Sequence, residues 1–118
     1  MDIKITGRNL DLDDSLKHYV TKKVRKLERI YKRIYKCDVV LGEEKNIKTA
    51  EIIVSLKRNK LVAKENALDI YASIDIVSDK IKKRLRRLND RINSQKRRGM
   101  WGKVFQRETW IGSTQEDI

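Results

Sequence analysis

The segment DIYASIDIVSDKIKKRLRRLNDRI, residues 69–92, decides the fold because its apolar residues recur every three or four positions. Residues with that spacing form one stripe along an α-helix, and the stripe must be buried against another element. The segment therefore predicts a long helix that begins near Asp69 and packs one face on a partner. The stripe consists of Ile70, Ile74, Val77, Ile81, Leu85, Leu88 and Ile92.

Runs of alternating apolar and polar residues precede this helix and predict strands. The clearest run has four apolar residues on one side, namely Ala50, Ile52, Val54 and Leu56. A turn at Arg58-Asn59 leads from it into a strand over residues 61–63, and an earlier strand covers residues 37–42, CDVVLG. Together these runs predict a three-stranded meander.

A second helical pattern lies nearer the N-terminus. Asp13 or Asp14 can cap a helix that we expect to continue to about Tyr35. Ahead of it, the β-branched residues within DIKIT predict a short strand over Lys4–Thr6 that Gly7 closes. The apolar stripe of this helix consists of Leu16, Val20, Val24, Leu27, Tyr31 and Ile34.

The predicted order of elements is β-α-β-β-β-α, an α+β arrangement. A strand-helix-strand unit normally forms a right-handed crossover between parallel strands, so the first two strands should be parallel. Two hairpins then extend the sheet in the order 1-2-3-4. Because each helix has a single apolar stripe, both should cover the same face of this four-stranded sheet in a two-layer sandwich.

The length of 118 residues suits one domain, and a single Cys leaves no internal disulfide. No run approaches the 18 apolar residues of a membrane span, and the N-terminus lacks the apolar core of a secretory signal. We expect a small cytoplasmic protein with one domain over residues 1–98. Residues 99–118 should be a short, flexible C-terminal tail, whose aromatic residues either stack on bases or dock on the domain.

Two segments hold nearly all of the positive charge. Residues 17–36 contain nine Lys or Arg against Glu28 alone, and residues 79–98 contain ten against Asp79 and Asp90, a net charge of +8 in each. The sum of these two net charges exceeds the net charge of the whole chain, which is +12. Such a concentration is typical of proteins that bind the phosphate backbone of nucleic acids.

On the predicted helices these cations lie largely opposite the apolar stripes. If the helices pack side by side, their inner flanks form a platform with a charge at each turn, about 5.4 Å apart. Solvated helix faces and an anionic membrane surface are the alternatives, and the commitment of both apolar faces to the sheet disfavours the membrane. The first helix presents Lys22, Lys26, Arg29, Arg33 and Lys36; the second presents Lys80, Lys83, Arg84, Arg87 and Arg91 on one flank, and Lys82 and Arg86 on the other.

Catalytic signals are absent from the sequence. His18 is the single His and we expect it at the surface, and Cys37 should be a small core residue. Asp75 and Asp79, four residues apart, either hold a divalent ion or pair with nearby lysines such as Lys82 and Lys83. We therefore expect no enzyme, no cofactor, no metal and no small-molecule substrate.

Motifs in a defined order over the first 98 residues resemble the ribosome hibernation factor family, meaning the short hibernation-promoting factors and the related protein Y. The resemblance rests on Ile5-Thr6-Gly7-Arg8, Lys23, Lys26-Leu27-Glu28, Val39-Val40-Leu41, Glu44-Lys45, Asp69, Tyr71-Ala72, Ile74-Asp75 and Asp79-Lys80. It implies the same β-α-β-β-β-α fold. It further implies a translation inhibitor that occupies the messenger and tRNA sites of the small subunit's decoding centre and keeps ribosomes idle under stress.

The implied partner is the small ribosomal subunit with its rRNA, and off the ribosome the protein should be monomeric. By position, the family's rRNA-contacting residues correspond to Lys23, Lys26, Lys80, Lys83 and Arg87. Combined with the two stripes, the predicted RNA-binding set is Lys22, Lys23, Lys26, Arg29, Arg33, Lys80, Lys83, Arg84, Arg87 and Arg91. A generic module for double-stranded or structured RNA is the alternative, and a small RNA-processing enzyme is a weaker one.

Three features depart from the family pattern. The chain has about twenty residues after Arg98, fewer than the dimerisation domain of the family's long form requires. Glu65 replaces a small residue, either on the inward face of its strand or at the sheet edge. Asn89 stands where several relatives have a basic residue, so the second helix is expected to reach less far along the RNA.

Overall fold

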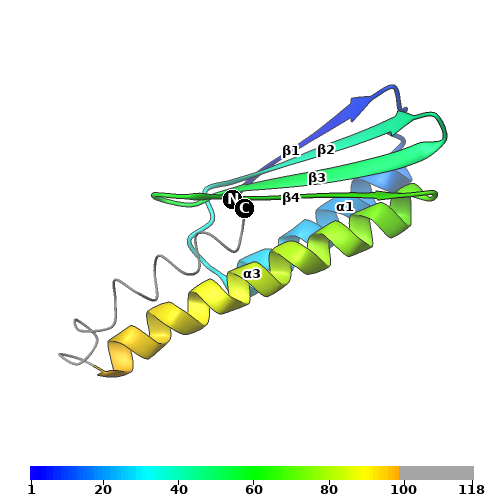
Figure 1. The fold of residues 1–118 in the computed structure, drawn as a ribbon. Helices are drawn as coiled ribbons and strands as arrows, with labels where there is room; N and C mark the ends of the chain where they lie inside the picture. The colour runs from blue at the N-terminus through cyan, green and yellow to red at the C-terminus, as the bar shows by residue number, and fades with distance from the viewer. Residues whose placement is uncertain (99–118) are drawn as a thin grey trace.

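The computed structural model describes residues 1–98 and shows a four-stranded sheet that is covered on one face by helices (Figure 1). The element order and the two layers confirm the predicted α+β sandwich. The predicted tail, residues 99–118, lies outside the described residues. In chain order the elements are β1 (Asp2–Arg8), α1 (Asp14–Arg25), α2 (Leu27–Ile30), β2 (Lys36–Glu44), β3 (Ile47–Ser55), β4 (Lys60–Ala67) and α3 (Ile70–Arg98).

The sheet has the predicted order β1-β2-β3-β4, with β1 parallel to β2 and the other pairs antiparallel. Lys45 and Asn46 form the two-residue loop between β2 and β3 and both have positive φ, 51° and 67°. Positive φ at both positions matches the right-handed twist of a hairpin, so this loop sets the register of the pair. Between β3 and β4 the Leu56 N–H donates to the Asn59 carbonyl at 2.8 Å, which confirms the predicted turn.

The first strand is longer than the expected Lys4–Thr6, because β1 pairs with β2 from Asp2 to Arg8. Gly7 continues the strand and does not close it. A Cβ at Gly7 would lie 2.7 Å from the Leu10 carbonyl oxygen, closer than real Cβ contacts allow. Glycine is therefore needed where the chain after β1 folds back over the strand.

The first helix is shorter than predicted. Asp13 caps α1, since its Oδ1 accepts from the Leu16 N–H at 2.7 Å. A break at Lys26 separates α1 from the single turn α2, and Tyr31 is extended, with φ −137° and ψ 112°. The prediction of a helix to about Tyr35 was therefore wrong.

The chain leaves the helix layer early because Tyr35 is already hydrogen-bonded into the sheet, directly before the central strand β2. Its N–H donates to the Ser55 carbonyl at 2.9 Å, and its carbonyl accepts from the Asp2 N–H at 3.1 Å. Residues 31–35 must therefore cross from the helices to the sheet. Ile34 is buried during this crossing, which is why it continued the apolar spacing without being helical.

The core lies between the sheet and the helices. Ile74, Val77, Ile81 and Leu85 of α3 are at most 1% exposed, which confirms the predicted stripe. Cys37 of β2 is fully buried in this core, and burial raises the pKa of its thiol to about 12. The thiol therefore stays protonated and serves as a small apolar residue.

The long helix α3 covers β3 and β4, and its C-terminal part extends past the sheet (Figure 1). The other helices lie beside it on the same side of the sheet, and α1 also contacts β1 (Figure 1). Within residues 1–98, no helix combines the length and the apolar character needed to cross a membrane. The exposed side of the helix layer is thus a surface with α1 and α2 on one side and α3 on the other.

Candidate nucleic-acid interface

A groove of 520 Å³ runs between the first helices and α3. Lys23 and Lys26 line it from one side, and Lys82 and Lys83 line it from α3. Lysines outnumber carboxylates in its lining, so the groove is positively charged. Its full lining is Lys23, Lys26, Leu27, Asp75, Ile76, Ser78, Asp79, Lys80, Lys82 and Lys83.

A second hollow of 210 Å³ lies between α2, the segment after it and the distal half of α3. It carries three more cations, Arg29, Lys32 and Arg33, and no carboxylate. On the α3 side it is lined by Asn89, Ile92 and Asn93. Positive charge therefore continues beyond the first groove, along the line where α2 and the segment after it meet α3. Asn89 of α3 adds no charge there.

The ten predicted RNA-binding residues all lie in or next to the helix layer, but they differ in exposure. Seven are exposed: Lys22, Lys26, Arg29, Arg33, Lys80, Lys83 and Arg87. Three are half-buried: Lys23, Arg84 and Arg91. One guanidinium nitrogen of Arg91, Nη1, is buried with no hydrogen-bond partner among the described residues.

Two members of the predicted first stripe are not helical, because the helix ends at Ile30. Arg33 lies in the segment that crosses to the sheet, where it lines the second hollow. Lys36 begins β2, and its ammonium pairs with Asp38 at 3.6 Å. The stripe Lys22, Lys26 and Arg29 remains, and Arg33 joins the same surface from the loop.

The predicted flanks of α3 also need correction. The Lys80 ammonium pairs with Glu65 of β4, and the Arg84 guanidinium donates to the Val62 carbonyl of the same strand. These two side chains therefore reach toward β4, although Lys80, like Lys83 of the same flank, also lines the groove shared with α1. The flank that faces α1 carries Lys82, which the predicted RNA-binding set omitted. The right-handed crossover from β1 to β2 could have indicated this flank from the sequence, because it determines the side of α3 on which the first helix lies.

Glu65 satisfies both of the alternatives drawn from the sequence. It lies on the helix-facing side of β4, in line with the buried Leu61 and Ala63, and β4 is an edge strand. Its side chain keeps 23% of its surface exposed and pairs with Lys80. The carboxylate is thus tolerated at this position because a cation of α3 reaches it.

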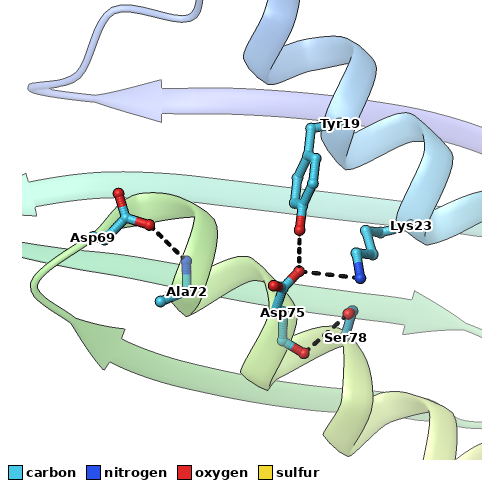
Figure 2. A network of polar contacts seen from close by, with 6 residues as sticks. All are labelled: Tyr19, Lys23, Asp69, Ala72, Asp75 and Ser78. Carbon is cyan, nitrogen blue, oxygen red and sulfur yellow. Dashed lines mark hydrogen bonds and ion pairs between the residues drawn. The ribbon is translucent and has the colours of Figure 1, made fainter.

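A polar cluster joins α1 to α3 at one end of the groove (Figure 2). The Tyr19 hydroxyl donates to Asp75 Oδ1, and the Lys23 ammonium lies 3.1 Å from the same oxygen. The Tyr19 ring meets Tyr71 edge-on, with centroids 4.9 Å apart, and Lys23 Nζ lies 5.6 Å from the Tyr19 ring centre. The hydrogen bond from Tyr19 and the adjacent Lys23 hold the pKa of Asp75 below its usual value.

The two carboxylates of α3 that line the groove thus pair with cations. Asp75 pairs across the groove with Lys23, and Asp79 pairs with Lys83 of the same helix at 3.4 Å. Among residues 1–93, no group of three or more His, Cys, Asp or Glu side chains is placed to hold a metal ion. His18 lies exposed on α1 and takes no part in the cluster.

Lys23 and Lys26 should differ in their contribution to polyanion binding, although both line the groove. Lys23 is already paired with Asp75, whereas the side chain of Lys26 is exposed to solvent. For binding to double-stranded RNA, we expect Lys26→Ala to make the slope of log K against log salt shallower by about 0.9. Lys23→Ala should change this slope much less. Titrations at several salt concentrations check this. Equal reductions for the two variants would contradict it.

The chain matches a family model described as Sigma 54 modulation protein / S30EA ribosomal protein over residues 3–93. It is 34% identical over 85 residues to the ribosome hibernation promoting factor of Azotobacter vinelandii, covering 72% of this chain and 79% of that protein. To the ribosome hibernation promoting factor of Escherichia coli K12 it is 33% identical over 92 residues, covering 78% and 97%. Among solved structures, the Thermus thermophilus Protein Y N-terminal domain matches with a TM-score of 0.69 and 34% identity, over 75% of this chain and 99% of that domain.

Proposed function

Because this chain belongs to the ribosome hibernation factor family, whose members are ribosome-associated proteins and not enzymes, we propose that it binds the small ribosomal subunit through its helix layer. The observation that carries the proposal is the line of cations along the junction of α1 and α2 with α3. These cations line two successive hollows on the side of the helices that faces away from the sheet. In the proposal, the bound protein occupies the decoding centre and excludes messenger and tRNA.

Charge and shape support an rRNA ligand. Lys and Arg side chains neutralise phosphates and release the counterions condensed on them, which supplies affinity without regard to sequence. Folded rRNA is recognised by the positions of its phosphates and sugars more than by base edges. Two neighbouring hollows on packed helices present their cations in a defined arrangement that can match such a pattern.

The inhibition proposed here is steric. No bond is made or broken, and the described part of the chain offers neither an activated thiol nor a metal cluster for such chemistry. Ribosomes would be blocked in the cytoplasm while the protein occupies the subunit and would resume translation when it dissociates. The protein is proposed to reach the subunit as a monomer.

Binding to purified small subunits should be saturable, tight and strongly dependent on salt. If about six phosphates are neutralised, log K should fall with log salt at a slope of about −4 to −5. Filter binding across a salt series measures the slope. An unrelated RNA duplex, titrated under the same conditions, is the control. A slope shallower than about −2, or equal affinity for the duplex, would contradict the proposal and favour a solvated surface or a generic RNA-binding module.

A further inference from the structure

Asp75 is an unusual residue to find in a groove that binds phosphates. The lining contains two carboxylates, and the other one, Asp79, pairs within its own helix. Asp75 instead reaches across the groove to α1, where it contacts Lys23 and Tyr19 (Figure 2). Its carboxylate therefore acts on the opposite wall of the groove.

Lys23 is held by this arrangement. Its ammonium lies 3.1 Å from Asp75 Oδ1 and 5.6 Å from the centre of the Tyr19 ring, and its side chain is 30% exposed against 70% for Lys83. The hydrogen bond to Asp75 also raises the pKa of Lys23, so the ammonium stays charged and paired. A phosphate at this end of the groove would have to displace a carboxylate to reach it.

We propose that Asp75 determines selectivity: it withdraws Lys23 from phosphate binding and keeps a negative charge at one end of the groove, which weakens binding to RNA that does not fit the surface. The inference rests on the proposed function and deepens it. Affinity for an arbitrary polyanion grows with the number of available cations, whereas affinity for a fitted partner also includes shape. Removing one cation therefore lowers the affinity for an arbitrary polyanion by a larger share than the affinity for the fitted partner.

A purely structural role for Asp75 is the competing explanation, because it also ties α1 to α3. The substitution Asp75→Asn separates the two roles. An asparagine has nearly the same size and retains an oxygen that can accept from the Tyr19 hydroxyl, but it does not hold Lys23 by charge. Asp90→Asn is the matched control, since Asp90 is exposed on the same helix, does not line either hollow and loses the same charge.

The experiment compares small ribosomal subunits with an unrelated RNA duplex as ligands, each over a salt series. For the duplex we expect Asp75→Asn to increase affinity about five- to tenfold near ~0.1 M salt and to steepen the slope by about 0.9, as one further cation becomes available. Asp90→Asn should change duplex affinity less than about twofold, because its charge is distant and screened. Lys23→Ala combined with Asp75→Asn should return the slope to that of the unsubstituted protein.

Other outcomes would overturn the proposal. Equal effects of Asp75→Asn and Asp90→Asn would show that only net charge matters, and weaker binding of both ligands would show that Asp75 is structural. If Asp75→Asn lowers the melting temperature too far to be tested, Lys23→Ala alone decides, because the proposal requires it to leave the duplex slope nearly unchanged. If the unsubstituted protein does not prefer small subunits over the duplex, the proposed function is wrong. The effect of Asp75→Asn on duplex binding would still test whether Asp75 withholds Lys23 from phosphates.

Discussion

Reversing Lys26 and Lys83 together to glutamate should weaken binding to the small subunit by more than about a hundredfold near ~0.1 M salt. The two ammonium groups line opposite walls of one groove, and both are exposed. Each reversal removes a contact with a phosphate and adds a repulsion, and the repulsions act on the same stretch of RNA. Co-sedimentation with purified small subunits measures the loss, and thermal unfolding should show a change in stability of under about 0.5 kcal/mol per exposed site.

The matched control is Lys57→Glu with Lys64→Glu, which changes the net charge equally. Lys57 lies in the turn between β3 and β4 and Lys64 on β4, both exposed and both outside the two hollows. Lys48 is a poor control, since its ammonium lies 2.5 Å from Glu43 Oε1 and is half-buried. If the two double variants lose affinity equally, the helix layer is not the binding surface.

Truncating Ile81 to alanine should lower the free energy of unfolding by about 2–5 kcal/mol, the largest stability effect that we expect from a single substitution. Ile81 is fully buried on α3, where it belongs to the stripe that packs between the helix layer and the sheet. The loss combines apolar surface no longer buried with the cavity that the neighbours cannot fill. Urea unfolding followed by circular dichroism measures it.

The comparison variant is Ile76→Ala, on the same helix but 42% exposed. The same atoms are removed there without creating a cavity, and alanine has the higher helix propensity, so the change should stay within about 0.5 kcal/mol. A similar loss at both positions would show that the stripe does not form the core. Small-subunit binding by Ile81→Ala should fall only under conditions in which part of the protein is unfolded.

The sequence predicted the element order, the strand order and the long helix, because periods of two and of 3.6 residues are local signals of which face is buried. It misplaced the end of the first helix because Ile34 keeps the helical spacing while lying in a crossing segment. That segment is held by two backbone hydrogen bonds at Tyr35, one donated to Ser55 and one accepted from Asp2, both distant in the sequence. Contacts of that kind leave no periodic signal.

The resemblance to hibernation factors and the prediction of a protein that is not an enzyme are confirmed by family membership. The assignment of flanks was less successful, because helical spacing shows which residues share a flank but not which flank faces a neighbour. Lys80 and Arg84 were grouped with the platform although both reach toward β4. The pairing of Lys23 with Asp75 joins residues from two helices, and no spacing within one helix predicts it.

The parallel pairing of β1 with β2 has a consequence for folding kinetics. Adjacent hairpins join β2, β3 and β4 through short turns, so this meander can form with little loss of chain entropy. Attaching β1 requires closing the much longer loop that contains α1 and α2. We expect β1 and these helices to dock last, onto a meander already covered by α3. Since α1 and α2 supply one wall of the groove, a chain arrested before that step lacks the proposed RNA-binding surface. If the proposal holds, RNA should stabilise only the fully folded protein.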